Sequence, residues 1–257
     1  MSDTVKTTAI YESENHKFFF LGWEEKEEGG VVQTNQYFVI DENEGTLLDP
    51  GGVHVFPRVL ANVSEILDIA KIKHIFFSHQ DPDVSSGVSL WLFAAQNAKV
   101  HISGLWTRFL PHFGVYNLSR IEPIPDKGGE IRLPSGKSFI LIPAHFLHSP
   151  GQFNLYDPVS KILFSGDIGA AVFPEGKRYP FVEDFEEHKK FMEGFHKRYM
   201  ASGQFCKKWV ETVRKYDVQI IAPQHGAIFR GENVKKFLDW LYNLKCGSDF
   251  IDELYGR

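Results

Sequence analysis

The chain has 257 residues, of which 43% are hydrophobic and 24% charged, the balance of an ordinary globular protein with a sizeable core. Its 28 Lys and Arg against 33 Asp and Glu give a net charge of −5 without a basic stripe, which argues against a nucleic-acid binder. The sequence has no apolar stretch long enough to cross a bilayer and no signal-peptide core at its start, so we expect a cytoplasmic protein without a membrane partner.

The first third of the chain predicts strands followed by one helix. Residues 18–23 read as a strand, and residues 24–30 as a charged connection with a Gly-Gly turn. Residues 36–48 predict a hairpin, which ends at the tight turn Asp49-Pro50-Gly51-Gly52. Apolar residues with a helical period over 55–70 then predict a helix that covers one face of the sheet.

A short apolar strand over 74–77 ends in the pattern His79-x-Asp81-x-Asp83. Pro82 disfavours the helical region for Asp81, so we expect the segment to stay extended, with all three side chains on one face. The ends of that face would lie about 13 Å apart, too far for one ion but suited to two metals about 3.5–4 Å apart. The pattern alone also fits an ordinary polar turn with a capping Asp.

The remaining chain predicts alternating strands and helices without repeats or low-complexity linkers. The predicted helices are 88–97, introduced by the capping hydroxyls of Ser85 and Ser86, an aromatic segment at 105–113, two helices within 185–215 broken near 201–203, and a terminal helix at 234–244. The predicted strands are 99–102, 130–133, 138–142, 152–156, 161–164 and 219–222, with loops at the prolines 123 and 125. This order predicts one α/β domain over residues 1–257, with helices outside two sheets.

Candidate metal ligands follow four of these strands. His79, Asp81 and Asp83 come after the first, and His148, Asp167 and His225 each follow a later strand. Strand ends that meet at one sheet edge form a cleft, and Gly166 and Gly169 leave room around the Asp167 carboxylate. Cys206 and Cys246 stand alone in segments with a helical pattern, which argues against a disulfide framework or a thiolate metal site.

With these motifs in place, the sequence resembles the metallo-β-lactamase superfamily, and within it the diiron domain of flavodiiron proteins. The resemblance runs through Thr34-Asn35, Leu48-Asp49-Pro50-Gly51, the His79 pattern, His148-Ser149-Pro150, Phe164-Ser165-Gly166-Asp167 and Pro223-Gln224-His225-Gly226. It implies an αββα sandwich of two mixed sheets flanked by helices. The 18 residues between His148 and Asp167 match the family spacing, so the resemblance places a ligand at His148 rather than His145. His145 would then either support a metal ligand from behind or simply pack against its neighbours.

The positions at which this chain departs from the family pattern indicate which group of diiron proteins it resembles most. Hydrolytic members carry His-x-His-x-Asp-His and flavodiiron proteins place Glu at the third position, whereas this chain has Asp81 there and Val84 at the last position. No flavodoxin domain is expected in the sequence, and so no flavin. This combination resembles the stand-alone oxygen-binding diiron proteins. It implies one iron on His79, Asp81 and His148, a second on Asp83 and His225 with an open position, and Asp167 bridging both.

The resemblance therefore implies a non-haem diiron protein that binds O₂ as an oxygen sensor or oxygen-binding protein, and that reduces O₂ slowly if at all. Its expected partners are O₂ and an external redox or signalling protein such as a chemoreceptor, with a homodimer suggested by the family. Two alternatives stay open: an O₂ or NO reductase with an external electron donor, and a dinuclear zinc hydrolase, in which a bridging hydroxide attacks an ester or phosphodiester. Nitrogen and oxygen donors without thiolate suit iron, manganese or zinc.

Overall fold

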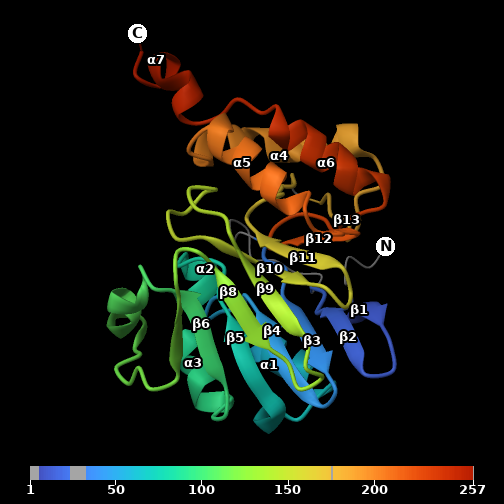
Figure 1. Cartoon of the computed structure of the whole chain (residues 1–257), viewed down its shortest axis with the longest axis vertical. Coiled ribbons are helices and arrows are strands. Elements are labelled where there is room, and N and C mark those ends of the chain that lie inside the picture. Colours follow the sequence, from blue (N-terminus) through green and yellow to red (C-terminus); the bar gives the residue numbers. More distant parts are fainter. Residues whose placement is uncertain (1–5, 24–32, 175, 257) are drawn as a thin grey trace.

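Two β-sheets lie face to face in the middle of the molecule, with helices on both outer sides (Figure 1). The computed structural model describes residues 6–23, 33–174 and 176–256. The first sheet contains, in spatial order, β1 (Thr8–Glu12), β2 (His16–Phe20), β3 (Tyr37–Asp41), β4 (Glu44–Leu48), β5 (Ile72–Phe76), β6 (Lys99–Ser103) and β7 (Ile121–Ile124). Its strands pair antiparallel from β1 to β4 and parallel from β4 to β7.

The second sheet is also mixed. Its order is β13 (Phe229–Arg230), β12 (Ile220–Pro223), β11 (Ile162–Gly166), β10 (Phe153–Asp157), β9 (Ser138–Pro143) and β8 (Gly129–Arg132), and only β11 and β12 pair in parallel. The helices are α1 (Phe56–Ser64), α2 (Pro82–Ser85), α3 (Val88–Ala94), α4 (Phe185–Tyr199), α5 (Gly203–Val213), α6 (Glu232–Tyr242) and α7 (Ile251–Leu254), with short 3₁₀ turns η1 (Ile69–Lys71), η2 (Thr107–Phe113) and η3 (Ser248–Phe250).

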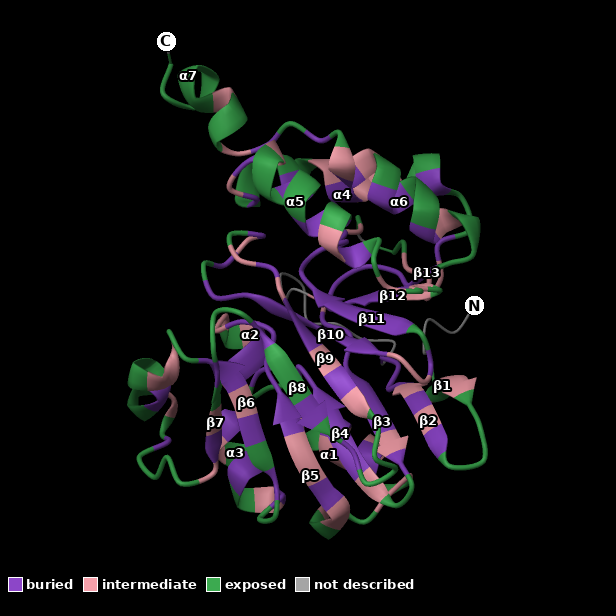
Figure 2. Cartoon of the chain, in the orientation of Figure 1, coloured by how far each residue is buried: buried purple, intermediate pink, exposed green. Residues whose placement is uncertain are grey.

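Three apolar clusters hold the layers together, and they follow from the period-2 alternation of the strands. Along β5, Ile75 packs toward α1 and α3, whereas the adjacent Phe76 packs between the two sheets with Phe164. A third cluster joins the second sheet to α4, α5 and α6 through side chains such as Phe237. The central strands are therefore buried on both faces (Figure 2), and the predicted αββα sandwich of the metallo-β-lactamase fold is confirmed.

Several predicted elements differ from the structure. Strands β1, β7 and β13 and helix α7 were not predicted, and the predicted helix over 55–70 ends at Ser64. Pro123 lies inside β7 rather than in a loop, because β7 is the edge of its sheet, where a missing N–H costs no ladder hydrogen bond. Helix α3 begins at Val88 with Gly87 as its N-cap and no side-chain cap, since the Ser85 hydroxyl donates to the Gln80 and Asp81 carbonyls instead. The charged connection predicted at 24–30 lies outside the described residues.

None of the helices in the described part of the chain combines the length and the apolar character that crossing a bilayer requires.

Candidate metal centre

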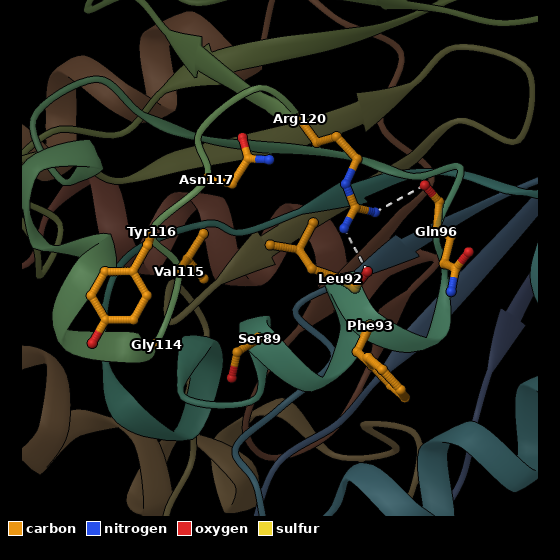
Figure 3. A pocket seen from close by; sticks show the side chains of 9 residues that line it. All are labelled: Ser89, Leu92, Phe93, Gln96, Gly114, Val115, Tyr116, Asn117 and Arg120. Atoms are coloured by element: carbon orange, nitrogen blue, oxygen red, sulfur yellow. Dashed lines mark hydrogen bonds between the residues drawn. The ribbon is translucent and has the colours of Figure 1, made fainter.

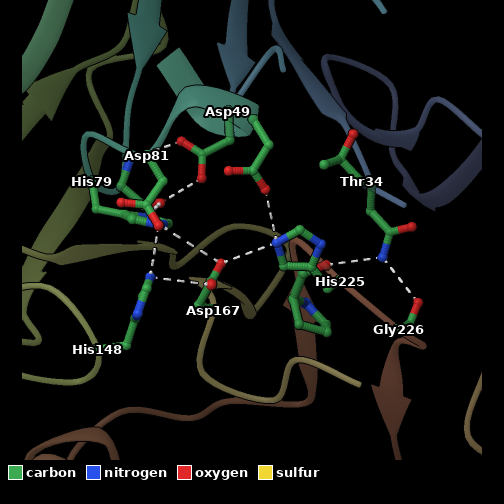
Figure 4. Close-up of polar contacts among 12 residues, drawn as sticks. Thr34, Asp49, His79, Asp81, His148, Asp167, His225 and Gly226 are labelled. Carbon is green, nitrogen blue, oxygen red and sulfur yellow. Dashed lines mark hydrogen bonds and ion pairs between the residues drawn. The ribbon is translucent and has the colours of Figure 1, made fainter. Parts of the chain in front are cut away.

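Six polar side chains meet at one edge of the sandwich, where β5, β9, β11 and β12 end (Figure 4). They are the six residues singled out in the sequence: His79, Asp81, Asp83, His148, Asp167 and His225. Each follows a buried strand whose position is fixed by the core, so residues far apart in the chain reach the same place. The structure thus brings these strand ends together in one constellation.

One half of this constellation consists of His79, Asp81 and His148. The His148 Nε2 atom lies 3.1 Å from Asp81 Oδ2 and 3.3 Å from His79 Nε2, and the His79 Nε2 to Asp81 Oδ2 distance is 3.7 Å. Two donors that are each about 2.1 Å from one ion lie about 3.0–3.5 Å apart at bond angles of about 90–110°. The three ligand atoms all lie within 4.8 Å of one another, so they can close around a single metal ion.

The other half consists of Asp83 and His225, and Asp167 lies between the two halves. His225 Nε2 is 3.2 Å from Asp83 Oδ2 and 3.5 Å from Asp167 Oδ1. Asp167 Oδ2 is 3.4 Å from His148 Nε2, on the opposite side. Asp167 Oδ1 is buried and has no hydrogen-bond partner among the described residues. A carboxylate oxygen left in this state is costly unless a cation accompanies it, so the residues present fit a dinuclear metal group.

The path of the chain between Asp81 and Asp83 corrects the sequence-based expectation. Asp81 is extended as predicted, with ψ of 149°, but Pro82 then begins the helical turn α2 instead of continuing an extended segment. Proline is well suited to the first position of a helix, where its missing N–H has no intrahelical partner. The turn brings Asp83 round to His225, so Asp81 and Asp83 serve different halves without standing on one extended face.

Hydrogen bonds on the far side of two imidazoles aim their Nε2 atoms into the site. The Ser78 hydroxyl donates to the Asp49 carboxylate, so its oxygen accepts from His79 Nδ1 at 2.8 Å. His225 Nδ1 donates to the Gln33 carbonyl at 2.5 Å. With Nδ1 protonated, each Nε2 keeps its lone pair for a metal. Sequence analysis missed Ser78 and Gln33, and only the motif around Asp49 pointed to this support.

The charges of the site pull protons onto these imidazoles. Burial lowers the pKa of His79, but Asp167 and Asp81 outweigh it and raise the pKa to about 9. The pKa of His225 is likewise lowered by burial and raised to about 9 overall by Asp167 and Asp83. Burial raises the pKa values of Asp81 and Asp83, yet the neighbouring imidazoles hold both below the ordinary range. The same excess of negative charge favours metal cations, which would displace those protons.

Two residues near the site do not join it. His145 packs its ring against Phe153 and donates from Nε2 to the Asp126 carbonyl at 2.7 Å, which favours simple packing over the support of a metal ligand. Val84 is fully buried in the apolar cluster between the first sheet and its helices. It offers no donor atom to either half of the constellation.

A hollow of about 460 Å³ lies elsewhere, between α3 and the loop after η2 (Figure 3). Phe93 and Tyr116 line it and are strongly exposed, and the Arg120 guanidinium beside them donates to the Leu92 and Gln96 carbonyls at the end of α3. None of the six constellation residues lines this hollow.

The two mixed sheets, the flanking helices and the polar cluster at the strand ends define a protein of the metallo-β-lactamase fold. The model of the family described as "ODP family beta lactamase" matches residues 32–226. The chain belongs to this family.

Solved structures and curated relatives agree with this membership. A structure described as "Peroxy diiron species of chemotaxis sensor ODP" is 54% identical with a TM-score of 0.88, and the match covers 97% of this chain and 100% of that one. The apo state of the chemotaxis sensor ODP from T. denticola is 53% identical with a TM-score of 0.86, covering 97% and 99%. The flavo-diiron protein FprA2 of Clostridium acetobutylicum is 21% identical over 228 residues, 85% of this chain and 56% of that protein. This chain therefore spans about half the length of that curated relative.

Proposed function

We propose that this chain is a non-haem diiron protein that binds O₂ and acts as an oxygen sensor or oxygen-binding protein. The observation that carries the proposal is the buried Asp167 carboxylate, which lies between two separate groups of nitrogen and oxygen donors. The similarity to a chemotaxis sensor described with a diiron species supports iron as the metal and O₂ as the ligand.

In this proposal His79, Asp81 and His148 hold one iron, Asp83 and His225 hold the second, and Asp167 bridges both. The distances within each group support the assignment. The side chains of Asp81 and Asp83 are 32% and 29% exposed, so solvent and small molecules reach this side of the site. Three carboxylates against two divalent ions also favour a higher oxidation state by Coulomb attraction. When bound, the iron pair would supply redox-active binding of O₂.

A protein with this function would need a partner protein in either of its two possible roles. Sustained reduction of O₂ or NO would draw electrons from an external donor protein, and a sensor would pass its state to a signalling protein such as a chemoreceptor. We place the protein in the cytoplasm and expect it to form a homodimer. A dinuclear zinc hydrolase is the alternative, disfavoured because Asp81 and Val84 replace two imidazoles that hydrolytic members use.

Anaerobic reconstitution with Fe(II), followed by metal analysis and visible spectra before and after air, tests the proposal. We expect about two irons per chain and a new charge-transfer band on oxygenation. The hydrolase would be established instead if the protein selectively retained zinc, showed no charge-transfer band after air, and turned over an ester or phosphodiester.

The choice between two neighbouring histidines gives a direct prediction. His148→Ala should lose at least one metal, because the imidazole lies 3.1 Å from Asp81 in its own half and 3.4 Å from Asp167 between the halves, whereas His145→Ala should keep its metal content. Metal analysis of both variants after identical reconstitution makes the comparison. Equal loss in the two variants would contradict the assignment of His148.

The hydrogen bonds that link His79 to Ser78 and Asp49 give another prediction. In Asp49→Asn one acceptor oxygen becomes an amide N–H₂, so the Ser78 hydroxyl is released and His79 loses its fixed orientation. We expect metal affinity to fall 10–100-fold, the usual cost of losing such a partner, with every proposed ligand still present. Competition with a chelator of known affinity measures the change. An unchanged affinity would show that Asp49 has no part in holding the metal.

A further inference from the structure

Two free cysteines lie in contact on the side of the molecule that carries α5 and α6. Cys206 on α5 and Cys246 in the turn after α6 are both fully buried, with Sγ atoms 3.7 Å apart. The sequence-based expectation of two solitary cysteines in helices is therefore wrong in two respects: the thiols touch, and Cys246 is not helical. A disulfide requires an Sγ separation of about 2.05 Å, so the gap to be closed is about 1.7 Å.

Backbone contacts hold the turn that carries Cys246 close to the start of α5, the helix that carries Cys206. Gly247 forms a β-bridge with Ser202, and the Cys246 and Gly203 amides both donate to the same Asp249 oxygen, at 2.9 and 2.8 Å. Gly247 has a φ of +52°, and a side chain there would collide with the Met200 carbonyl oxygen. These contacts hold the turn that carries Cys246 against the start of α5, so closing the gap between the sulfurs falls to the two side chains.

We propose that Cys206 and Cys246 form a reversible intrachain disulfide on exposure to hydrogen peroxide, which ties the C-terminal segment 246–256 to α5. One thiol, as its thiolate, attacks a peroxide oxygen and becomes a sulfenic acid while water leaves. The second sulfur then displaces water from the sulfenic acid and closes the S–S bond. Two thiols lose two electrons and two protons in total, and one peroxide becomes two waters.

The surroundings make this reaction slow and selective for a small oxidant. The hydrogen bond with Cys246 and burial raise the pKa of the Cys206 thiol, so little thiolate is present. The segment after Cys246 ends in α7, which projects away from the body with every residue exposed (Figure 1). Opening of this thinly packed end would admit peroxide, and the disulfide would then hold the end closed. Oxidation of the two thiols by peroxide needs no metal, so it is independent of the proposed oxygen chemistry.

The test uses the full-length, metal-loaded protein and its Cys206→Ser and Cys246→Ser variants. After treatment with hydrogen peroxide, each is denatured, labelled with N-ethylmaleimide and weighed as an intact chain. We expect maleimide uptake by the wild type to fall from two per chain to none, with a mass loss of two hydrogens, no covalent dimer, and full recovery with dithiothreitol. Each Ser variant should show no monomer that is lighter by two hydrogens, and should instead gain oxygen or form a covalent dimer through its remaining thiol.

Amide exchange over residues 247–256 provides the second measurement. Oxidation should slow exchange there in the wild type and leave it unchanged in Cys206→Ser, since that variant cannot form the bond that ties the segment to α5. Persistent labelling of both thiols, covalent dimers in the wild type, or exchange that does not respond to a formed disulfide would each overturn the proposal.

Discussion

Replacing Asp167 by asparagine should empty both halves of the metal site, whereas Asp83→Asn should empty one. Asp167 is the group within 3.5 Å of ligand atoms in both halves, through a different oxygen on each side. Asparagine keeps the size of the side chain but removes the negative charge and converts one ligand oxygen into a donor. We expect iron to fall from about two ions per chain to well below one in Asp167→Asn, and to about one in Asp83→Asn.

Metal analysis after identical anaerobic reconstitution makes this comparison, with thermal unfolding of the metal-free variants as the control for folding. Asp83→Asn is the matched control, because it is the same chemical change at a carboxylate that serves one half. Two retained irons in Asp167→Asn would contradict the bridging assignment, and equal loss in the two variants would show that the two metals bind as one unit.

The sequence was informative about the site because buried strands are easy to recognise and their ends are fixed by the core. His79, Asp167 and His225 each follow a continuous apolar run within three residues, and the paired strands carry them to one edge. This inference needs only the period of the strand and the position of the first polar residue after it. It works best where the strand is buried on both faces, as β5 and β11 are.

The parts that failed depend on contacts between distant segments. Asp83 reaches His225 through a helical turn, and the Gln33 carbonyl orients His225 across 192 residues of sequence. The strands β7 and β13 were missed because β7 contains Pro123 and β13 has two residues, so neither shows a clear period. The contact between Cys206 and Cys246 was also missed, because no local sequence pattern shows that two residues 40 positions apart will touch in the fold.

The edge of the sandwich opposite the metal site carries a second buried polar group. His16 at the start of β2 lies between Asp41 at the end of β3 and Asp157 at the end of β10, with both ring nitrogens 2.8 Å from a carboxylate oxygen. Each carboxylate accepts from the ring, so both nitrogens carry protons and the imidazole is a cation. Because β10 belongs to the second sheet, this cation joins the two sheets to each other.

Replacing His16 by alanine should therefore cost about 3–5 kcal/mol of stability, because Asp41 and Asp157 would stay buried without their shared cation. The triple variant His16→Leu, Asp41→Asn, Asp157→Asn removes the charges together and should lose much less, which separates the uncompensated charge from lost packing. Urea unfolding at equal metal content measures both. A cost below about 1 kcal/mol in His16→Ala would contradict the bridging role.

The pH dependence of stability provides a second test of the contact of His16 with Asp41 and Asp157. Burial lowers the pKa of His16, but the hydrogen bonds and charges of Asp157 and Asp41 outweigh burial and raise it above the ordinary value. A pKa raised in the folded state contributes stability that is complete below the unfolded value of about 6.5 and is lost as pH rises through the folded pKa. Wild-type stability should thus decline with rising pH in that window, and His16→Ala should lack that part of the decline. An identical pH slope in the two proteins would mean that the imidazole is already neutral, and that the two sheets are joined here by neutral hydrogen bonds alone.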